Sequence, residues 1–268
     1  MIEGRTATRP IGLAAQTVTG LTPARTVEVA AAAGFDMVGL TVDPATWSDT
    51  DTRAVRAALA GSGLVALDAE VIRIRSGFEA DFARLLDIAG VIGIRHVIVV
   101  SFAEQRDVTR DTLARIAAHA ATVNIRPVLE FGAFTRVPTL QAAVDLASEA
   151  GVGVLADPMH LHRSGGVPAD LIRLSPWLLP YAQLCDAGPA LAYADAADLL
   201  FEARESRHDI GEGVLPLADF VAALPSGTPL MNEVRSRALA DRIGDPAALA
   251  THYARTMRYW LRENDRCG

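Results

Sequence analysis

Short apolar, β-branched runs alternate along the chain with longer Ala- and Leu-rich segments whose apolar residues recur at helical spacing. The alternation repeats eight times. Several of the short runs are almost continuously apolar, which is typical of parallel strands covered on both faces. The expected strands span residues 11–18, 37–42, 64–74, 96–102, 127–131, 152–156, 182–185 and 229–234.

The helical segments carry clear start and stop signals. Thr22 offers an N-cap, Pro23 suits the first helical position, and Gly34 ends the first helix. The expected helices span residues 23–33, 52–59, 78–89, 108–123, 140–150 and 246–262, with shorter helical pieces at 169–174, 190–204 and 217–224.

Eight strand–helix units in 268 residues predict an α/β protein built as a single (β/α)8 TIM barrel. An open doubly wound sheet would need a glycine-rich phosphate turn after the first strand, and residues 14–20 contain no GxGxxG. No linker divides the chain, so we expect one domain over residues 10–268. Residues 2–5 resemble a protease cleavage tag, so we expect residues 1–9 to be a disordered or tag-derived N-terminus.

Composition narrows the function classes. Half of the residues are hydrophobic and the formal charge is −7, with no Lys/Arg stripe, so we expect neither a nucleic-acid partner nor a membrane partner. Cys185 and Cys267 form no CxxC pair, which excludes zinc ribbons and thioredoxin-like redox chemistry. The chain has no apolar run of about 18 residues and no secretion signal at its start, so we expect a cytoplasmic protein.

Polar side chains end four of the expected strands. Apolar runs precede three acids, Glu130, Asp157 and Glu233, and Gln183 lies in the seventh strand. Period-two alternation places each acid in an inward-facing row. In a barrel the carboxyl ends of the strands meet at one mouth, where active sites are built. Three unpaired carboxylates there would repel one another, so we expect a divalent metal, with Mn²⁺ or Mg²⁺ preferred for oxygen ligands and Co²⁺ or Zn²⁺ as alternatives.

Several motifs appear in a specific order: LEF around Glu130, DPxH from Asp157 to His160, QLCD from Gln183, the Gly-Glu-Gly turn at 211–213, and NEV around Glu233. In this order they resemble the xylose-isomerase-like TIM-barrel family, which includes sugar-phosphate isomerases and epimerases, hydroxypyruvate isomerase, inosose dehydratase and dehydroshikimate dehydratase. The resemblance covers residues 10–260. It implies that Glu130, Asp157, Gln183 and Glu233 are the metal ligands, although many members have His where Gln183 stands.

The resemblance also implies a small polyhydroxy keto substrate and an enediolate intermediate, with Glu130 and Glu233 as the proton-transfer bases. Isomerase, epimerase and dehydratase share that intermediate, so we expect an isomerase or epimerase of a keto-sugar or hydroxy-keto acid, with a dehydratase of an inosose or dehydroshikimate-like substrate as the alternative. A non-catalytic sugar-binding barrel is a further alternative. A phosphodiester hydrolase resembling endonuclease IV would need a histidine-rich zinc site and a basic surface. This chain has six histidines and a formal charge of −7, and neither feature is apparent, so we do not expect this class.

Four further residues are candidate substrate contacts. His160 lies three residues after Asp157, and Arg207, just before the Gly-Glu-Gly turn, is a candidate clamp for an anionic group. Gln16 lies on the first expected strand. Glu70 lies on the third strand, with pairing to Arg73 or Arg75 as its structural alternative. Barrels of this type are often dimers, so we also expect a possible homodimer.

Overall fold

The computed structural model describes residues 9–76, 82–190 and 194–264, and within them eight parallel strands form one sheet in the order β6-β5-β4-β3-β2-β1-β8-β7. A parallel bridge between Ala156 and Ala182 joins the two ends of this order, so the sheet closes into a barrel. The prediction of a single (β/α)8 TIM barrel is therefore confirmed. The strands are β1 (Ile11–Leu13), β2 (Met37–Thr41), β3 (Val65–Ile74), β4 (His96–Ser101), β5 (Arg126–Glu130), β6 (Gly153–Leu155), β7 (Ala182–Leu184) and β8 (Leu230–Asn232).

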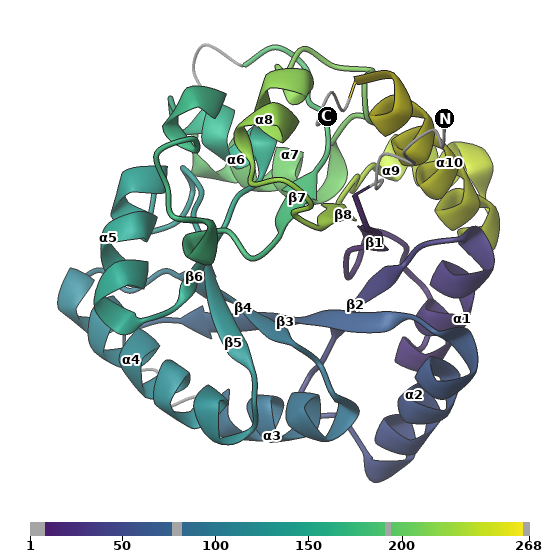
Figure 1. Cartoon of the computed structure of the whole chain (residues 1–268), viewed down its shortest axis with the longest axis horizontal. Helices are drawn as coiled ribbons and strands as arrows, with labels where there is room; N and C mark the ends of the chain where they lie inside the picture. The colour runs from purple at the N-terminus through teal and green to yellow at the C-terminus, as the bar shows by residue number, and fades with distance from the viewer. Residues whose placement is uncertain (1–8, 77–81, 191–193, 265–268) are drawn as a thin grey trace, which may run out of the picture.

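The helices surround the strands (Figure 1). Those that follow strands β1 to β5 are α1 (Pro23–Ala33), α2 (Asp49–Ser62), α3 (Phe82–Ile92), α4 (Arg106–Thr122) and α5 (Leu140–Ala150). The second half of the chain contributes α6 (Pro158–Arg163), the short 3-10 turns η1 (Pro168–Asp170) and η2 (Pro176–Leu178), α7 (Ala196–Glu205), α8 (Leu217–Ala223), α9 (Arg237–Ile243) and α10 (Pro246–Asn264). No helix among the described residues is both long and apolar enough to cross a membrane.

The cap signals explain where most of these helices begin and end. The Thr22 hydroxyl accepts a hydrogen bond from the Arg25 amide, and Gly34 adopts a left-handed φ of 87° that ends α1. The expected end of α3 at Gly90 is wrong, because the helix continues to Ile92 and Gly93 supplies the left-handed residue instead. Parts of the expected helices 78–89 and 190–204 lie outside the described residues.

The interior of the barrel is filled by one apolar side chain from each strand or its immediate end. These residues form a cluster of their own: Ala14, Met37, Leu67, Ile98, Val128, Leu155, Tyr181 and Met231. The larger apolar cluster packs the outer face of the strands against the helices. Val128, Leu155 and Met231 therefore point inward as their alternation predicts, and the acids two residues later follow them toward the mouth.

Candidate functional site

Asp157 links the end of β6 to the start of α6. Its Oδ1 accepts hydrogen bonds from the backbone amides of Met159 (2.8 Å) and His160 (3.0 Å), so the carboxylate is the N-cap of α6. Pro158 occupies the first helical position, where its missing amide costs nothing. This cap holds His160 on the first turn of α6, beside the carboxylate, and the sequence analysis missed the helix itself.

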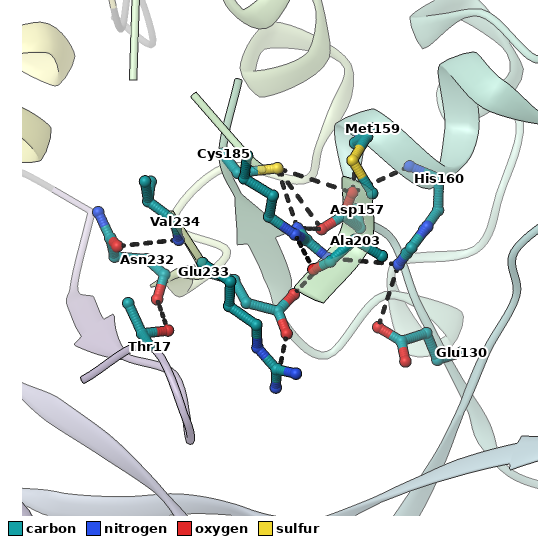
Figure 2. A network of polar contacts seen from close by, with 12 residues as sticks. Thr17, Glu130, Asp157, Met159, His160, Cys185, Ala203, Asn232, Glu233 and Val234 are labelled. Carbon is teal, nitrogen blue, oxygen red and sulfur yellow. Dashed lines mark hydrogen bonds and ion pairs between the residues drawn. The ribbon is translucent and has the colours of Figure 1, made fainter. Parts of the chain in front are cut away.

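Arg207 lies at the centre of the polar cluster and keeps only 2% of its surface exposed. Its Nη1 lies 2.5 Å from Asp157 Oδ2 and 3.0 Å from the Cys185 sulfur, and its Nε donates to the Ala203 carbonyl at 2.9 Å. Its Nη2 lies 3.2 Å from Glu233 Oε2. The guanidinium thus joins the acids that follow β6 and β8. Figure 2 shows these acids, Asp157 and Glu233, within one network of polar contacts.

Glu233 is shared between two arginines. In addition to Arg207, Arg235 reaches it, with Nη2 3.3 Å from Glu233 Oε1. The same Nη2 lies 2.8 Å from Glu70 Oε2. The expectation that Glu70 pairs with Arg73 or Arg75 is therefore wrong, because the turn after β8 brings Arg235 closer to its carboxylate.

Glu130 stands at the end of β5 without a close cationic partner. Its nearest basic neighbour is His160, whose Nε2 lies 3.9 Å from Glu130 Oε1, beyond hydrogen-bond distance. His160 Nε2 lies 3.4 Å from Arg207 Nη2, and Phe134 contacts the ring edge-on. Glu130 is therefore the least neutralised acid of the cluster.

These surroundings separate the pKa values of the acids. Burial, together with the charges of Glu233 and Asp157, raises the pKa of Glu130 well above its ordinary value. Burial raises the pKa of Glu233 to about 7, against the opposing effect of Arg207 and Arg235. Burial also acts to raise the pKa of Asp157, but Arg207 and His160 outweigh it and lower the value to about 2. Burial lowers the pKa of His160 to about 4, so its ring is neutral near pH 7.

The four expected metal ligands do not fit a divalent cation as they are arranged. Both oxygens of Asp157 already accept hydrogen bonds, and both oxygens of Glu233 lie within 3.3 Å of a guanidinium. Gln183 is buried, and its Oε1 has no hydrogen-bond partner. Among the described residues, no group of three or more His, Cys, Asp or Glu side chains could hold a metal ion.

The acids and arginines border a small cavity of about 70 Å³ at the mouth of the barrel. Its polar lining includes Glu70, Glu130, His160, Arg207 and Glu233. A hollow of about 460 Å³ adjoins it and shares Glu70, Val71 and Arg73 with it. Gln16 lines the larger hollow, so the four candidate substrate contacts are distributed over two neighbouring spaces.

The sequence analysis did not select three arginines at the mouth of the barrel as site residues: Arg235, Arg73 and Arg204. Arg235 lies two positions after Glu233, so the alternation that selected the acid also points to the arginine. Arg73 and Arg204 line the small cavity, and Arg204 lies on α7, three residues before Arg207, which follows the end of that helix. Within the described residues, neither Arg73 nor Arg204 forms a hydrogen bond or an ion pair, and the charge of Arg204 adds to burial in lowering the pKa of Arg73.

The loop that carries Arg207 is fixed from two sides. Asp186, buried just after β7, accepts hydrogen bonds from the backbone amides of Ala187, Gly213 and Leu215. Arg163 forms a two-pronged ion pair with Glu202 of α7 and also donates to the Gly188 carbonyl. Asp186 and Arg163 therefore position the segment around Arg207.

Comparison with solved structures shows the fold. The chain is similar to the IolI protein with a bound zinc atom (15% identity, TM-score 0.79, 95% of this chain and 99% of that one) and to the probable 3-DHS dehydratase AsbF of Bacillus anthracis (15%, 0.72, 93% and 98%). It is also similar to D-allulose 3-epimerase from Methylomonas sp. (16%, 0.68, 94% and 98%).

A fusion protein of a xylose isomerase-like TIM barrel with a 4-hydroxyphenylpyruvate dioxygenase is 23% identical, with a TM-score of 0.77 over 97% of this chain. This chain spans only 45% of that protein's length. No curated protein matches the chain. A family model described as xylose isomerase-like TIM barrel matches residues 27–263, so the resemblance expected from the motifs is confirmed. The chain belongs to the xylose isomerase-like TIM barrel family.

Proposed function

We propose that this chain is an enzyme that moves protons beside a carbonyl group, as an isomerase or epimerase of a small hydroxy-keto acid. The observation that carries the proposal is that Glu130 and Glu233 border one small cavity together with His160, Arg207 and Arg235. The solved structures of similar fold include an epimerase and a dehydratase, which supports this class of reaction.

In the proposed reaction Glu233 is the base and Glu130 is the acid. With a pKa of about 7, Glu233 is partly ionised at neutral pH and takes the proton from the carbon next to the carbonyl. The electrons of the broken C–H bond form an enediolate. Glu130, whose raised pKa favours its protonated form, gives a proton to the opposite face of the same carbon in an epimerase. In an isomerase it gives the proton to the neighbouring carbon, while the hydroxyl proton of the first carbon moves to the former carbonyl oxygen. Exchange with solvent then resets both carboxyls.

The negative charge of the enediolate is stabilised by guanidinium groups in this proposal. Arg207 and Arg235 line the cavity beside the reacting carboxyls, and their donors are held by the buried ion pairs described above. Fixed positive groups in a water-poor site stabilise developing charge more strongly than water does. Because the expected metal ligands do not fit a cation as arranged, no step of the proposal uses the Mn²⁺ or Mg²⁺ that the sequence predicts.

The preference for an acid substrate rests on Arg73 and Arg204. Among the described residues these two guanidiniums form no ion pair, although the charge of Glu70 acts on Arg73, and their presence in one cavity favours a ligand that brings a negative charge. The small cavity, of about 70 Å³, brings the reacting carboxyls and the arginines to one space. The rest of the substrate would extend into the adjoining hollow beside Gln16.

The test is exchange of substrate protons with deuterated water, followed by proton NMR across hydroxypyruvate, dehydroshikimate, inososes and keto-sugars. We expect exchange with a hydroxy-keto acid, its loss in Glu233→Gln, and in Glu130→Gln the loss of net isomer formation. Glu149→Gln is the matched control, because Glu149 is exposed and pairs with Arg106 on the outer helices. If Glu233→Gln retains exchange, or Glu130→Gln still forms the isomer, the two-carboxyl assignment is wrong.

The same screen distinguishes the alternatives. A dehydratase forms the same intermediate but expels a β-hydroxyl group, so it releases water and an unsaturated product instead of an isomer. A sugar-binding barrel without catalysis binds its ligand and exchanges no protons. The cytoplasmic location and the homodimer stay predictions of the sequence.

A further inference from the structure

The guanidinium of Arg207 has a partner on every side. Its Nε donates to the Ala203 carbonyl, its Nη1 reaches Asp157 Oδ2 and the Cys185 sulfur, and its Nη2 lies 3.2 Å from Glu233 Oε2. Arg207 keeps 2% of its surface exposed. A buried arginine with this many acceptors is held in place, because moving its guanidinium away from them would leave a charge unpaired and out of contact with water.

The carboxylates of Asp157 and Glu233 are held in place by contacts of the same network. Asp157 Oδ1 caps α6 while Oδ2 faces Arg207, so neither oxygen is directed at an open volume. Glu233 divides its oxygens between Arg207 and Arg235. A divalent cation that used these two acids would have to take the position of the Arg207 guanidinium.

We propose that Arg207 is the resident cation of this cluster and that it excludes a divalent metal from the position between Asp157 and Glu233. The sequence indicates that clustered acids at the mouth need a positive charge among them, and the structure supplies that charge from the chain itself. Arg207 and the neighbouring Arg235 form ion pairs with Asp157, Glu233 and Glu70 without a bound ion. The similar IolI protein was solved with a zinc atom, whereas we assign the positive charge of this cluster to an arginine.

Among the described residues, two oxygens of the expected ligands are buried without a hydrogen-bond partner, Gln183 Oε1 and Glu233 Oε2, and Arg207 Nη2 lies 3.2 Å from the second of these. Gln183 Oε1 is buried and unpaired, as a metal ligand would be in a structure without the ion. A single neutral amide oxygen supplies neither the charge nor the number of donors that a divalent cation requires. The charged oxygens that a divalent cation would need are those of Asp157 and Glu233, and Arg207 forms ion pairs with both residues.

The test is a calorimetric titration of the full chain, freed of metal, with MnCl₂ and separately with ZnCl₂. We expect the unmodified chain to show no saturable site with a Kd below about 1 mM. Arg207→Met removes the positive charge and keeps an apolar side chain in its place. We expect this variant to bind one Mn²⁺ or Zn²⁺ at least ~100-fold more tightly, with the gain lost in the double variant Arg207→Met/Asp157→Asn.

Two results of the titrations would overturn the proposal. One equivalent of metal on the unmodified chain, lost in Asp157→Asn, overturns the proposal. A folded Arg207→Met chain that takes up no cation overturns the role given to Arg207. If circular dichroism shows that Arg207→Met does not fold, Arg207→Gln carries the same test, since its amide can still donate to the Ala203 carbonyl, and the titration of the unmodified chain decides in any case. No substrate is used, so the result is independent of the proposed reaction.

Discussion

Asp157 and Arg207 form an ion pair in which neither side chain keeps more than 2% of its surface exposed. Removing one member of a buried pair leaves the other charge without a partner in a poor solvent, at a cost of about 3–5 kcal/mol. We therefore expect Asp157→Ala to lower the free energy of unfolding by about 4 kcal/mol, measured by urea denaturation.

Asp195→Ala is the matched control for this prediction. Asp195 caps α7 through the amides of Ala197 and Asp198, as Asp157 caps α6, but Asp195 is exposed and has no arginine partner in the part of the chain that the structure describes. Loss of an exposed cap costs about 1 kcal/mol. Equal losses in the two variants would show that the pair with Arg207 contributes nothing beyond the cap.

Gly213 allows the turn after Arg207 to pass close to Asp186. A Cβ at position 213 would lie 2.3 Å from both the Ala187 carbonyl oxygen and Asp186 Oδ1. Gly213→Ala must therefore displace the turn or break the hydrogen bonds that Asp186 accepts, and we expect a loss of about 1–3 kcal/mol in unfolding free energy. Gly61→Ala in α2 is the control.

A Cβ at Gly61 meets no atom within 4 Å, and the residue lies inside a helix. Alanine is the better helix former there by about 1 kcal/mol, so Gly61→Ala should stabilise the chain. A Gly213→Ala variant as stable as this control would mean that the turn at 211–213 is not held by Asp186.

The sequence predicts the barrel and the placement of its acids because both follow from local periodicity. Val128 and Glu130 share one face of β5, and the same alternation brings Asp157 and Glu233 to the same mouth. The pattern of each strand contains this information. The boundary of α3 was missed because Gly90 is tolerated inside a packed helix, and the left-handed position falls at Gly93.

The charge balance of the mouth depends instead on pairing across the fold. Arg207 lies 50 positions from Asp157, and Arg235 lies 165 positions from Glu70. A charge count shows that the acids need a cation but does not say whether it comes from solution or from an arginine on a distant loop. For Asp157 the cation is an arginine because the packing of the segment between β7 and β8 places Arg207 beside its carboxylate.

Arg204 is expected to contribute to substrate binding rather than to the proton transfers. It lines the cavity with Arg73, and neither side chain forms an ion pair among the described residues. Arg204→Met should raise KM for the acid substrate about 10-fold, which corresponds to ~1.4 kcal/mol, with kcat changed much less. Arg56→Met, an exposed change on α2, should leave KM unaltered. A fall in kcat with unchanged KM would contradict the binding role of Arg204.

Asp68 and His96 are register partners on β3 and β4 at the inner end of the barrel, where the His96 ring stacks against Tyr181. Burial, with the charge of Glu70, raises the pKa of Asp68 to about 7. Burial lowers the pKa of His96 to about 4. Near pH 5.5 the folded chain therefore holds a proton on Asp68 that the unfolded chain has lost, and lacks one on His96 that the unfolded chain carries, by roughly one proton each.

The two residues thus oppose each other in the dependence of stability on pH. Between about pH 4 and pH 6.5, Asp68 makes stability fall as pH rises, by about 1.4 kcal/mol per unit, and His96 makes it rise. Relative to the unmodified chain, Asp68→Asn should therefore gain stability as pH rises from about 4.5 to 6.5, by about 3 kcal/mol. His96→Gln should lose stability over the same range, by less, because its ring is only partly buried.

Urea denaturation at the two pH values checks both signs, and the double variant should lie between the single ones. Taking differences from the unmodified chain removes the contribution of the other titrating groups, provided that they are not coupled to this pair. If Asp68→Asn gives the same stability difference at both pH values, Asp68 is ionised in the folded barrel, and burial without a hydrogen-bond partner does not govern its protonation.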